Sequence, residues 1–223
     1  MPSCPLNRFF SPAQCARYYG VITRRYSCRA YAAAPDAGEL AALNYAAARV
    51  CLPGTRIVIA DCTDQLFFGM PLVERIRGTR KCAYVLAQDG MGNPRLLAGI
   101  GGEAFVLEAA AMGLDTCWVT GTYRRGEVPQ EILNDGERLI AVIALGHAKE
   151  PPQQIIRHRK SLSQICLDAP DQWPLWAYRA AEAVRIAPSA VNRQPWRLAY
   201  AQRSLRLMGK NPDNVDLGIA LMH

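Results

Sequence analysis

The sequence predicts an α+β fold built as one domain, and three observations support this prediction. Apolar residues recur with helical spacing in several segments, most clearly over 93–112. Short apolar runs bounded by turn residues, such as 56–60 and 139–146, indicate strands between the helices. Half of the 223 residues are apolar and a fifth are charged, which is typical of a globular protein large enough for one sizeable core or two small ones.

Two helices near the start are marked by capping boxes. Ser11 and Gln14 are spaced as an N-cap and the residue that reaches back to it, and Asp36 and Glu39 repeat this pattern. Pro12 then falls in the first helical position, where its missing N–H costs nothing. The helices expected from these starts span residues 12–23 and 37–50.

The unbroken apolar run 82–87 predicts a strand buried on both faces. In the helix that follows, the glycines at 99, 101 and 102 would let another helix or a cofactor come close. They are not a dinucleotide fingerprint, because no strand and tight turn directly precede them. The remaining elements are expected as strand 114–119, short helix 127–133, strand 139–146, helix 171–186 with Trp173, Trp176 and Tyr178 in the core, hairpin 197–202 and 204–208, and a helix from 215.

A weak internal repeat predicts two related halves within the domain, at about 1–150 and 151–223. A helix, a turn and a strand that begins with arginine and apolar residues occur over 39–60 and again over 173–200. Each is followed later by an apolar helix that contains glycine. This pattern would be consistent with two halves packed about a pseudo-twofold axis.

Charge and composition exclude several classes of protein. The formal net charge of +7 comes without the long basic runs interleaved with aromatic residues that a nucleic-acid surface usually shows. We therefore expect no nucleic-acid partner. No apolar stretch approaches a membrane span and residues 1–8 do not look like a signal peptide, so a cytoplasmic location without a membrane partner is expected. Eight scattered cysteines without a Cys-x-x-Cys pair, and three histidines, favour neither a metal site nor a disulfide framework.

The loop over 187–196 has the composition of a ligand-binding segment. Pro188 and Pro195 fix the backbone at two points, while Ser189 and Ala190 would let it approach a ligand closely. The carboxamide of Asn192 offers a donor and an acceptor side by side, which suits a flat heterocycle with alternating acceptors and N–H groups. The alternative is an ordinary helix end followed by turn residues.

Two short basic segments could bind a small phosphorylated ligand. In an extended segment Arg25, Ser27 and Arg29 point to one side, where they could grip a phosphate, a polyol or a carbonyl. Arg157 and Arg159 precede a short helix capped by Ser161 or Ser163, and a helix N-terminus beside arginines suits phosphate. The alternatives are a solvated basic loop and a solvated run of charge.

Together these motifs resemble the flavin-dependent nitroreductase family. The similarity is carried by Arg25–Tyr31, Leu107–Trp118, Ile143–Gly146, Arg157–Leu162 and Ala187–Trp196. The Pro-Ser-x-x-Asn block lies near the end of the chain instead of shortly after the first arginine motif, which resembles a divergent branch of the family. The resemblance implies a central, mostly antiparallel sheet flanked by helices. Ordinary members hold the flavin at a homodimer interface, whereas here a homodimer and a site within one chain both stay open.

The resemblance also implies FMN bound without a covalent link, and ping-pong hydride transfer from NADH or NADPH to a small aromatic electron acceptor such as a nitroaromatic or a quinone. No catalytic side chain is implied, because the flavin carries the difficult step. A non-enzymatic flavin-binding or sensing protein and a cofactor-free scaffold are the alternatives. The residues expected to bind the cofactor are Arg25, Ser27, Arg29, Thr120, Gly121, Arg157, Arg159, Pro188, Ser189, Ala190 and Asn192.

Overall fold

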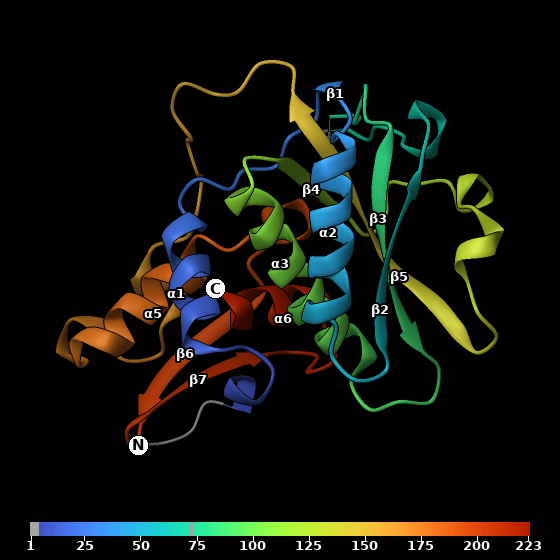
Figure 1. Ribbon diagram of the computed structural model, residues 1–223. Helices are drawn as coiled ribbons and strands as arrows, with labels where there is room; N and C mark the ends of the chain where they lie inside the picture. Colours follow the sequence, from blue (N-terminus) through green and yellow to red (C-terminus); the bar gives the residue numbers. More distant parts are fainter. Residues whose placement is uncertain (1–4, 72–73) are drawn as a thin grey trace.

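An antiparallel sheet organises the structure, a computed structural model that describes residues 5–71 and 74–223 (Figure 1). Within this part of the chain the sheet has five strands, and all of its strand pairs are antiparallel. The order is β1-β5-β3-β2, and β4 also pairs with β5. The strands are β1 (Tyr31–Ala33), β2 (Thr55–Asp61), β3 (Lys81–Gln88), β4 (Asp115–Val119) and β5 (Glu137–Ala148). The predicted α+β class and antiparallel sheet are confirmed.

Helices pack on this sheet around the central helix α3 (Figure 1). The α-helices are α1 (Pro12–Val21), α2 (Ala37–Val50), α3 (Pro94–Ala111), α4 (Leu162–Ile165), α5 (Leu175–Arg185) and α6 (Val215–Met222). Most side chains of α3 are buried, and so is nearly all of β3, as its unbroken apolar run predicts. Among the helices of residues 5–71 and 74–223, none combines the length and apolarity that crossing a membrane requires.

Glycines let two elements come very close to α3. The backbones of α3 and α6 meet at Gly99 and Gly218, where an added Cβ would collide with the carbonyl groups of the opposite helix. At Gly102 an added Cβ would collide with the ring of Trp118 from β4. The sequence predicted that another helix or a cofactor would approach these glycines. The structure shows that α6 does so at Gly99 and that the indole ring of Trp118 does so at Gly102.

The C-terminal third of the chain forms a second packing unit beside the sheet. Its hairpin consists of β6 (Trp196–Ala201) and β7 (Ser204–Gly209), close to the predicted bounds. Trp196, Leu198 and Ile165 are fully or almost fully buried there with the apolar side of α5 and α6. This unit carries the loop after α5 and places it near the N-terminal segment of the chain. The relation between two halves of the domain stays a prediction.

Both predicted capping boxes are present. In the second, the Glu39 N–H donates to the Asp36 carboxylate at 2.8 Å, and the Asp36 N–H donates to the Glu39 carboxylate at 2.8 Å. Ser11 and Gln14 form the equivalent pair ahead of α1. Of the two serines considered for α4, Ser161 is the cap, because its N–H donates to the Gln164 side chain at 2.9 Å.

We expect Asp36→Ala to lower the free energy of unfolding by about 1 kcal/mol, because the orphan N–H groups of the first turn of α2 lose their acceptor. The melting temperature should fall by about 2–4 °C for a chain of this size. Asp36→Asn, which keeps an acceptor at the cap, is the matched control in thermal melts followed by circular dichroism. Equal melting temperatures for the alanine variant and the unchanged protein would contradict this role.

Several predicted elements differ from the structure. The expected helix 127–133 is two short 3-10 turns, Arg125–Glu127 and Gln130–Ile132. The expected helix 171–186 begins as α-helix only at Leu175, after a separate 3-10 turn. Of its three aromatics only Trp173 is buried, whereas Trp176 is 51% exposed and Tyr178 is 38% exposed. Their placement in the core was therefore wrong, because the apolar stripe of α5 is made mainly of alanines.

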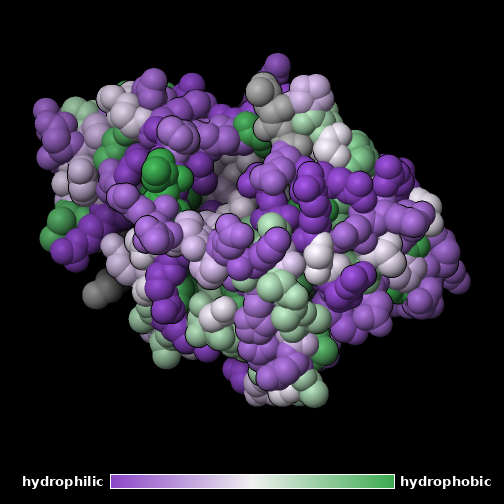
Figure 2. All heavy atoms as spheres, turned by 90° about the horizontal axis from the view of Figure 1, so that it is seen from above, coloured by the Kyte–Doolittle hydropathy of each residue, from purple (hydrophilic) through white to green (hydrophobic). Residues whose placement is uncertain are grey.

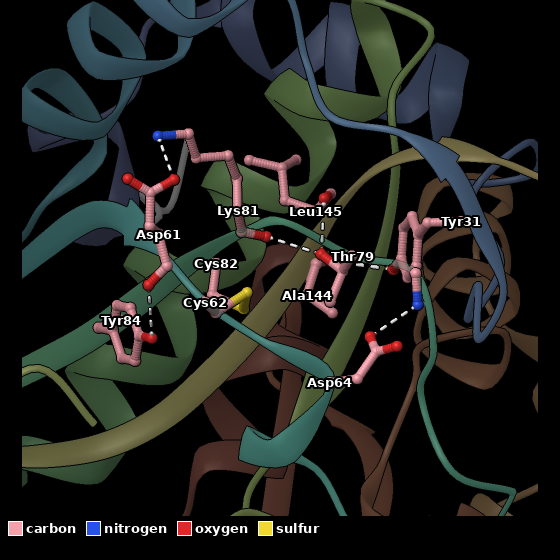
Figure 3. The surroundings of a disulfide bond; sticks show 11 residues. Tyr31, Asp61, Cys62, Asp64, Thr79, Lys81, Cys82, Tyr84, Ala144 and Leu145 are labelled. Carbon is pink, nitrogen blue, oxygen red and sulfur yellow. Dashed lines mark hydrogen bonds and ion pairs between the residues drawn. A yellow bond between two sulfur atoms is a disulfide. The ribbon is translucent and has the colours of Figure 1, made fainter. Parts of the chain in front are cut away.

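The cysteines also depart from expectation. Cys62 and Cys82 form a disulfide between the end of β2 and the start of β3, whereas the sequence favoured no disulfide framework (Figure 3). The bond closes the segment 62–82, which contributes several side chains to the site. Disulfides persist mainly in oxidising compartments, so this bond does not favour the expected cytoplasmic location. Cys28, Cys117 and Cys166 are buried and Cys15 and Cys51 are half-buried, which agrees with the expectation that most cysteines are buried, and Cys4 lies outside the described residues.

Candidate functional site

The loop after α5 is held in a defined shape by side chains around it. Val191, Asn192 and Gln194 all have positive φ angles of 44°, 55° and 48°, a region that costs energy for residues other than glycine. The Gln194 N–H donates to the Ser189 hydroxyl at 2.9 Å, and the Ala190 N–H donates to the buried Asp216 carboxylate at 3.0 Å. Contacts of this kind keep a strained loop in place, as a ligand-binding loop requires.

The same loop binds the basic segment 157–160. Arg159 Nη1 donates to Asn192 Oδ1 at 2.8 Å, and Asn192 Nδ2 donates to the His158 carbonyl at 2.6 Å. The Lys160 N–H donates to the Gln194 side chain at 2.8 Å. Two motifs that lie more than 30 residues apart in sequence therefore form one surface, although the Asn192 carboxamide is engaged with protein groups.

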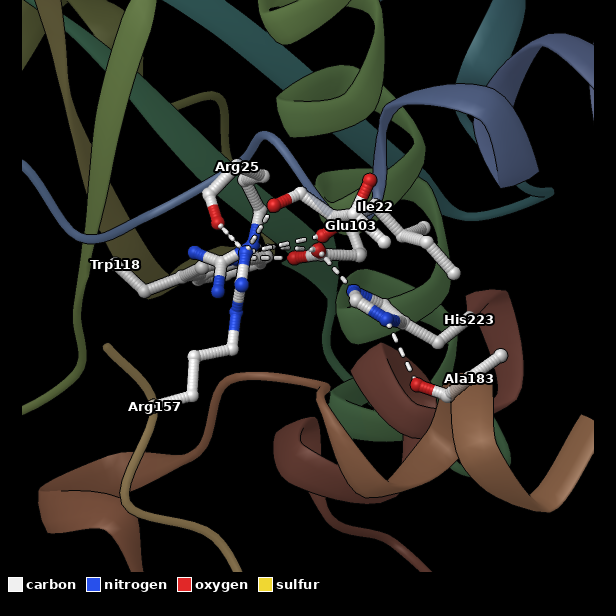
Figure 4. Close-up of polar contacts among 8 residues, drawn as sticks. Ile22, Arg25, Glu103, Trp118, Arg157, Ala183 and His223 are labelled. Carbon is white, nitrogen blue, oxygen red and sulfur yellow. Dashed lines mark hydrogen bonds and ion pairs between the residues drawn. The ribbon is translucent and has the colours of Figure 1, made fainter. Parts of the chain in front are cut away.

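Arg157 links this surface to the N-terminal motif (Figure 4). Its Nη2 donates to the carbonyls of Thr23 at 2.7 Å and of Arg25 at 2.6 Å, just after α1 ends. These carbonyls lie at the negative end of the α1 dipole, so the guanidinium also stabilises the helix end. A single chain thus brings together both basic segments and the loop.

Arg25, Ser27 and Arg29 surround Cys117 of β4. Ser27 pairs with Thr116 in a parallel bridge, which runs this segment alongside β4. Burial raises the pKa of Cys117, and the charges of Arg29 and Arg25 with the Ser27 hydroxyl act in the opposite direction. Thr120 and Gly121 follow at the exposed end of β4. Pro188 is buried, whereas Ala190 is exposed.

The side chain of Arg25 points into the interior (Figure 4). It is 3% exposed, and its Nε lies 3.8 Å from Glu103 Oε1 without a hydrogen-bond partner. Glu103 also contacts the indole N–H of Trp118 and the ring of His223, and Figure 4 shows these groups beside Arg25. Glu103, Trp118 and His223 were not among the predicted site residues.

The arginines form a cationic cluster with too little negative charge around it. Burial and the neighbouring charge of Arg25 lower the pKa of Arg157. Burial and the charges of Arg25, Arg157 and Arg185 lower the pKa of Arg159 to about 10. In the described part of the chain neither Arg157 nor Arg159 forms an ion pair with a carboxylate, and the buried Arg159 Nε has no hydrogen-bond partner. Such a cluster fits a phosphate group, which would supply both charge and acceptors.

Two cavities lie along β4. Figure 2 shows one face of the molecule, which is mostly hydrophilic and hollowed near its middle. The first has a volume of about 180 Å³ and contains Arg24, Arg25 and Tyr26 on one wall. The second is smaller, with a volume of about 40 Å³, and has aromatic and apolar walls beside one arginine and one glutamate. It is lined by Arg29, Phe67, Phe68, Glu74, Ile76, Cys117, Trp118, Val119 and Thr122. Asn192 lines neither cavity and connects to Arg25 through Arg159 and Arg157.

The fold and this site define an α+β protein with a cationic, partly aromatic pocket along one strand of an antiparallel sheet. A family model described as "Putative TM nitroreductase" matches residues 18–223, so the chain belongs to this nitroreductase family. A comparison with curated proteins finds no match.

Solved structures show the same fold. A "putative nitroreductase" from Thermotoga maritima is similar with a TM-score of 0.62 and 21% identity, over 92% of this chain and 80% of that one. A "putative NADH dehydrogenase/NAD(P)H nitroreductase" from Parabacteroides distasonis has a TM-score of 0.53 and 20% identity, over 67% and 96%. A nitroreductase with bound FMN from Desulfitobacterium hafniense has a TM-score of 0.51 and 20% identity, over 64% and 94%.

Sequence reasoning missed the groups that lie behind the arginines. Glu103 is a single carboxylate within the apolar, glycine-rich part of α3, and this isolation was a usable signal for a buried partner. Phe67 and Phe68 carried no signal beyond a half-apolar segment. His223 could not have been linked to Glu103 from sequence, because 120 residues separate them.

Proposed function

We propose that the protein is an FMN-dependent oxidoreductase that takes electrons from NADH or NADPH and passes them to a nitroaromatic or quinone acceptor in a ping-pong cycle. One observation carries the proposal: Arg25, Arg157 and Arg159 converge from two distant segments, and in the described part of the chain only Arg25 among them pairs with a carboxylate, that of Glu103. A phosphorylated ligand would provide the missing negative charge. Membership of the nitroreductase family supports a flavin as that ligand.

The residues present fit FMN as a set of donors. Arg157 and Arg159 would hold the phosphate, with Arg25, Ser27 and Arg29 along the remainder of the cofactor. The loop residues Pro188, Ser189, Ala190 and Asn192 would lie along the ring system, and Thr120 and Gly121 would approach it through their backbone. When bound, FMN supplies hydride acceptance and electron release, so the chain needs no side chain as general acid or base. The role of the chain's own residues would be to bind the cofactor, orient it and shield it.

We also propose that the site is complete within one chain. The basic segment 157–160 reaches the carbonyl of Arg25 and the side chain of Asn192 without a second copy. A homodimer is then not required for cofactor binding. Sedimentation of the FMN-loaded protein at low concentration tests this, because a monomer that retains FMN supports the proposal and loss of FMN on dissociation contradicts it.

The function is tested first by the absorption spectrum of the purified protein and then by titration with FMN. We expect FMN to bind and its absorption near 450 nm to bleach when NADH or NADPH is added, then to recover when a nitroarene or quinone is mixed in. Protein that stays colourless with excess FMN would contradict the cofactor assignment. A yellow protein that no nicotinamide reduces would support flavin binding without enzyme activity.

A further inference from the structure

Glu103 is the centre of a buried polar cluster that joins four elements (Figure 4). Its Oε2 accepts a hydrogen bond from the Trp118 indole N–H at 2.7 Å, and its Oε1 lies 2.9 Å from His223 Nε2. His223 Nδ1 lies 3.1 Å from the Ala183 carbonyl of α5. The side chains of both Glu103 and His223 are 0% exposed. The cluster therefore connects α3, β4 and the ends of α5 and α6 through one carboxylate.

The hydrogen bonds of this cluster determine where its protons are. A carbonyl can only accept, so His223 Nδ1 must carry the proton of its bond to Ala183. If His223 were neutral, Nε2 would then present a lone pair to Glu103, and the bond would require a protonated carboxyl group. The Trp118 N–H and the Arg25 cation at 3.8 Å both favour an ionised carboxylate. The consistent arrangement is a doubly protonated His223 against an ionised Glu103.

We propose that Glu103 is a positioning residue for Arg25 and that it acts as one unit with a protonated His223, a role that rests on the proposed function of the arginine cluster. The pair is neutral overall, so it does not cancel the positive charge that the cluster offers to a phosphate. Both carboxylate oxygens are already engaged by Trp118 and His223. Arg25 is therefore held by charge at 3.8 Å, and its Nε forms no hydrogen bond in the described part of the chain.

This arrangement explains how a buried arginine can remain available to a ligand. A direct hydrogen-bonded ion pair would use the guanidinium donors and fix them on protein. Here the carboxylate is restrained from two sides, and Gly102 leaves room for the Trp118 ring against α3. Trp118 also lines the aromatic cavity, so the same carboxylate places one wall of that cavity.

Two variants separate positioning from general stability. Glu103→Gln can still accept from Trp118 and can donate to a neutral His223, so every hydrogen bond survives without the shared charge pair. Glu103→Leu removes both bonds and leaves Trp118 and His223 without partners. Glu108→Leu is the matched control, because Glu108 is a buried carboxylate on the same helix whose partners are different: it accepts a hydrogen bond from the Tyr18 hydroxyl at 2.7 Å and forms an ion pair with Arg17.

We expect Glu103→Leu to weaken FMN binding by about tenfold or more, and Glu103→Gln to weaken it by about three- to tenfold, because both variants remove the charge that holds Arg25 and only the glutamine keeps the hydrogen bonds of Trp118 and His223. Glu108→Leu should lower the melting temperature and leave FMN affinity within about threefold. Equal loss of FMN affinity in the two leucine variants, or unchanged affinity in Glu103→Leu, would overturn the positioning role. If the unchanged protein bound no FMN, the proposed function would fail instead.

Nitrogen NMR of the protein without added flavin tests the proton arrangement independently of FMN. Both ring nitrogens of His223 should show the shifts of protonated nitrogen at neutral pH. In Glu103→Gln, Nε2 should show the shift of an unprotonated nitrogen while Nδ1 stays protonated. An unprotonated Nε2 in the unchanged protein would overturn the proposed pair even if Glu103→Leu folds poorly.

Discussion

Arg159→Met should weaken FMN binding by about 1.5–3 kcal/mol, or roughly 10- to 150-fold in Kd, without making the flavin-free protein less stable. Arg159 is partly buried, its Nε has no partner, and neighbouring arginine charges act against its own charge. Without a ligand its removal relieves the repulsion with Arg25 and Arg157, which offsets the loss of its hydrogen bond to Asn192. With a phosphate present, its removal takes away a charge-assisted hydrogen bond. The affinity for FMN should therefore fall, while the stability of the flavin-free protein should stay the same or rise.

Flavin fluorescence titrations and thermal melts of the flavin-free protein measure these two effects. Arg206→Met is the control for the loss of one positive charge, because Arg206 is exposed on β7, away from the cluster. It should leave FMN affinity almost unchanged at physiological salt, where exposed charges are screened. An Arg159→Met protein that binds FMN as tightly as the unchanged protein would remove the basic segment 157–160 from the phosphate site.

Local patterns in the sequence predicted most of the fold. The capping boxes at Ser11 and Asp36 fix two helix starts through contacts only three residues long. The apolar run of β3 predicted burial on both faces, and the glycines of α3 predicted a close approach. Such signals succeed because the atoms that cause the structure are neighbours in the chain. The short helix 127–133 failed because its few apolar residues do not distinguish an α-helix from 3-10 turns.

Long-range partners were the part that sequence could not provide. The basic residue Arg157 was expected at a phosphate, yet its guanidinium also binds carbonyls at the end of α1, more than 130 residues away. Whether a cation serves a helix end or a ligand depends on which elements meet in space. The same holds for Glu103 and His223, whose contact depends on α6 packing against α3. The predicted motifs identified the surface of the site, and the residues behind it came only from the structure.

Reduction of the Cys62–Cys82 disulfide should lower the free energy of unfolding by about 3 kcal/mol, the estimate for closing a loop of this length in the unfolded chain. The two cysteines are separated by 20 residues, and the bond joins the end of β2 to β3. Chemical denaturation with and without a phosphine reductant measures the difference. A Cys62→Ala and Cys82→Ala double variant is the control, because its unfolding midpoint should not respond to reductant.

The effect should reach the aromatic cavity before it reaches the proposed phosphate site. Phe67, Phe68 and Ile76 lie within the closed segment and line that cavity, whereas Arg157 and Arg159 lie outside the segment. Reduction removes the covalent restraint on the segment that forms this wall of the cavity. The Asp64 carboxylate, however, still accepts a hydrogen bond from the Gly78 N–H at 2.7 Å (Figure 3). We therefore expect KM for an aromatic acceptor to rise while the Kd for FMN changes little. An equal change in both constants would show that the disulfide supports the whole fold and has no particular connection to the acceptor cavity.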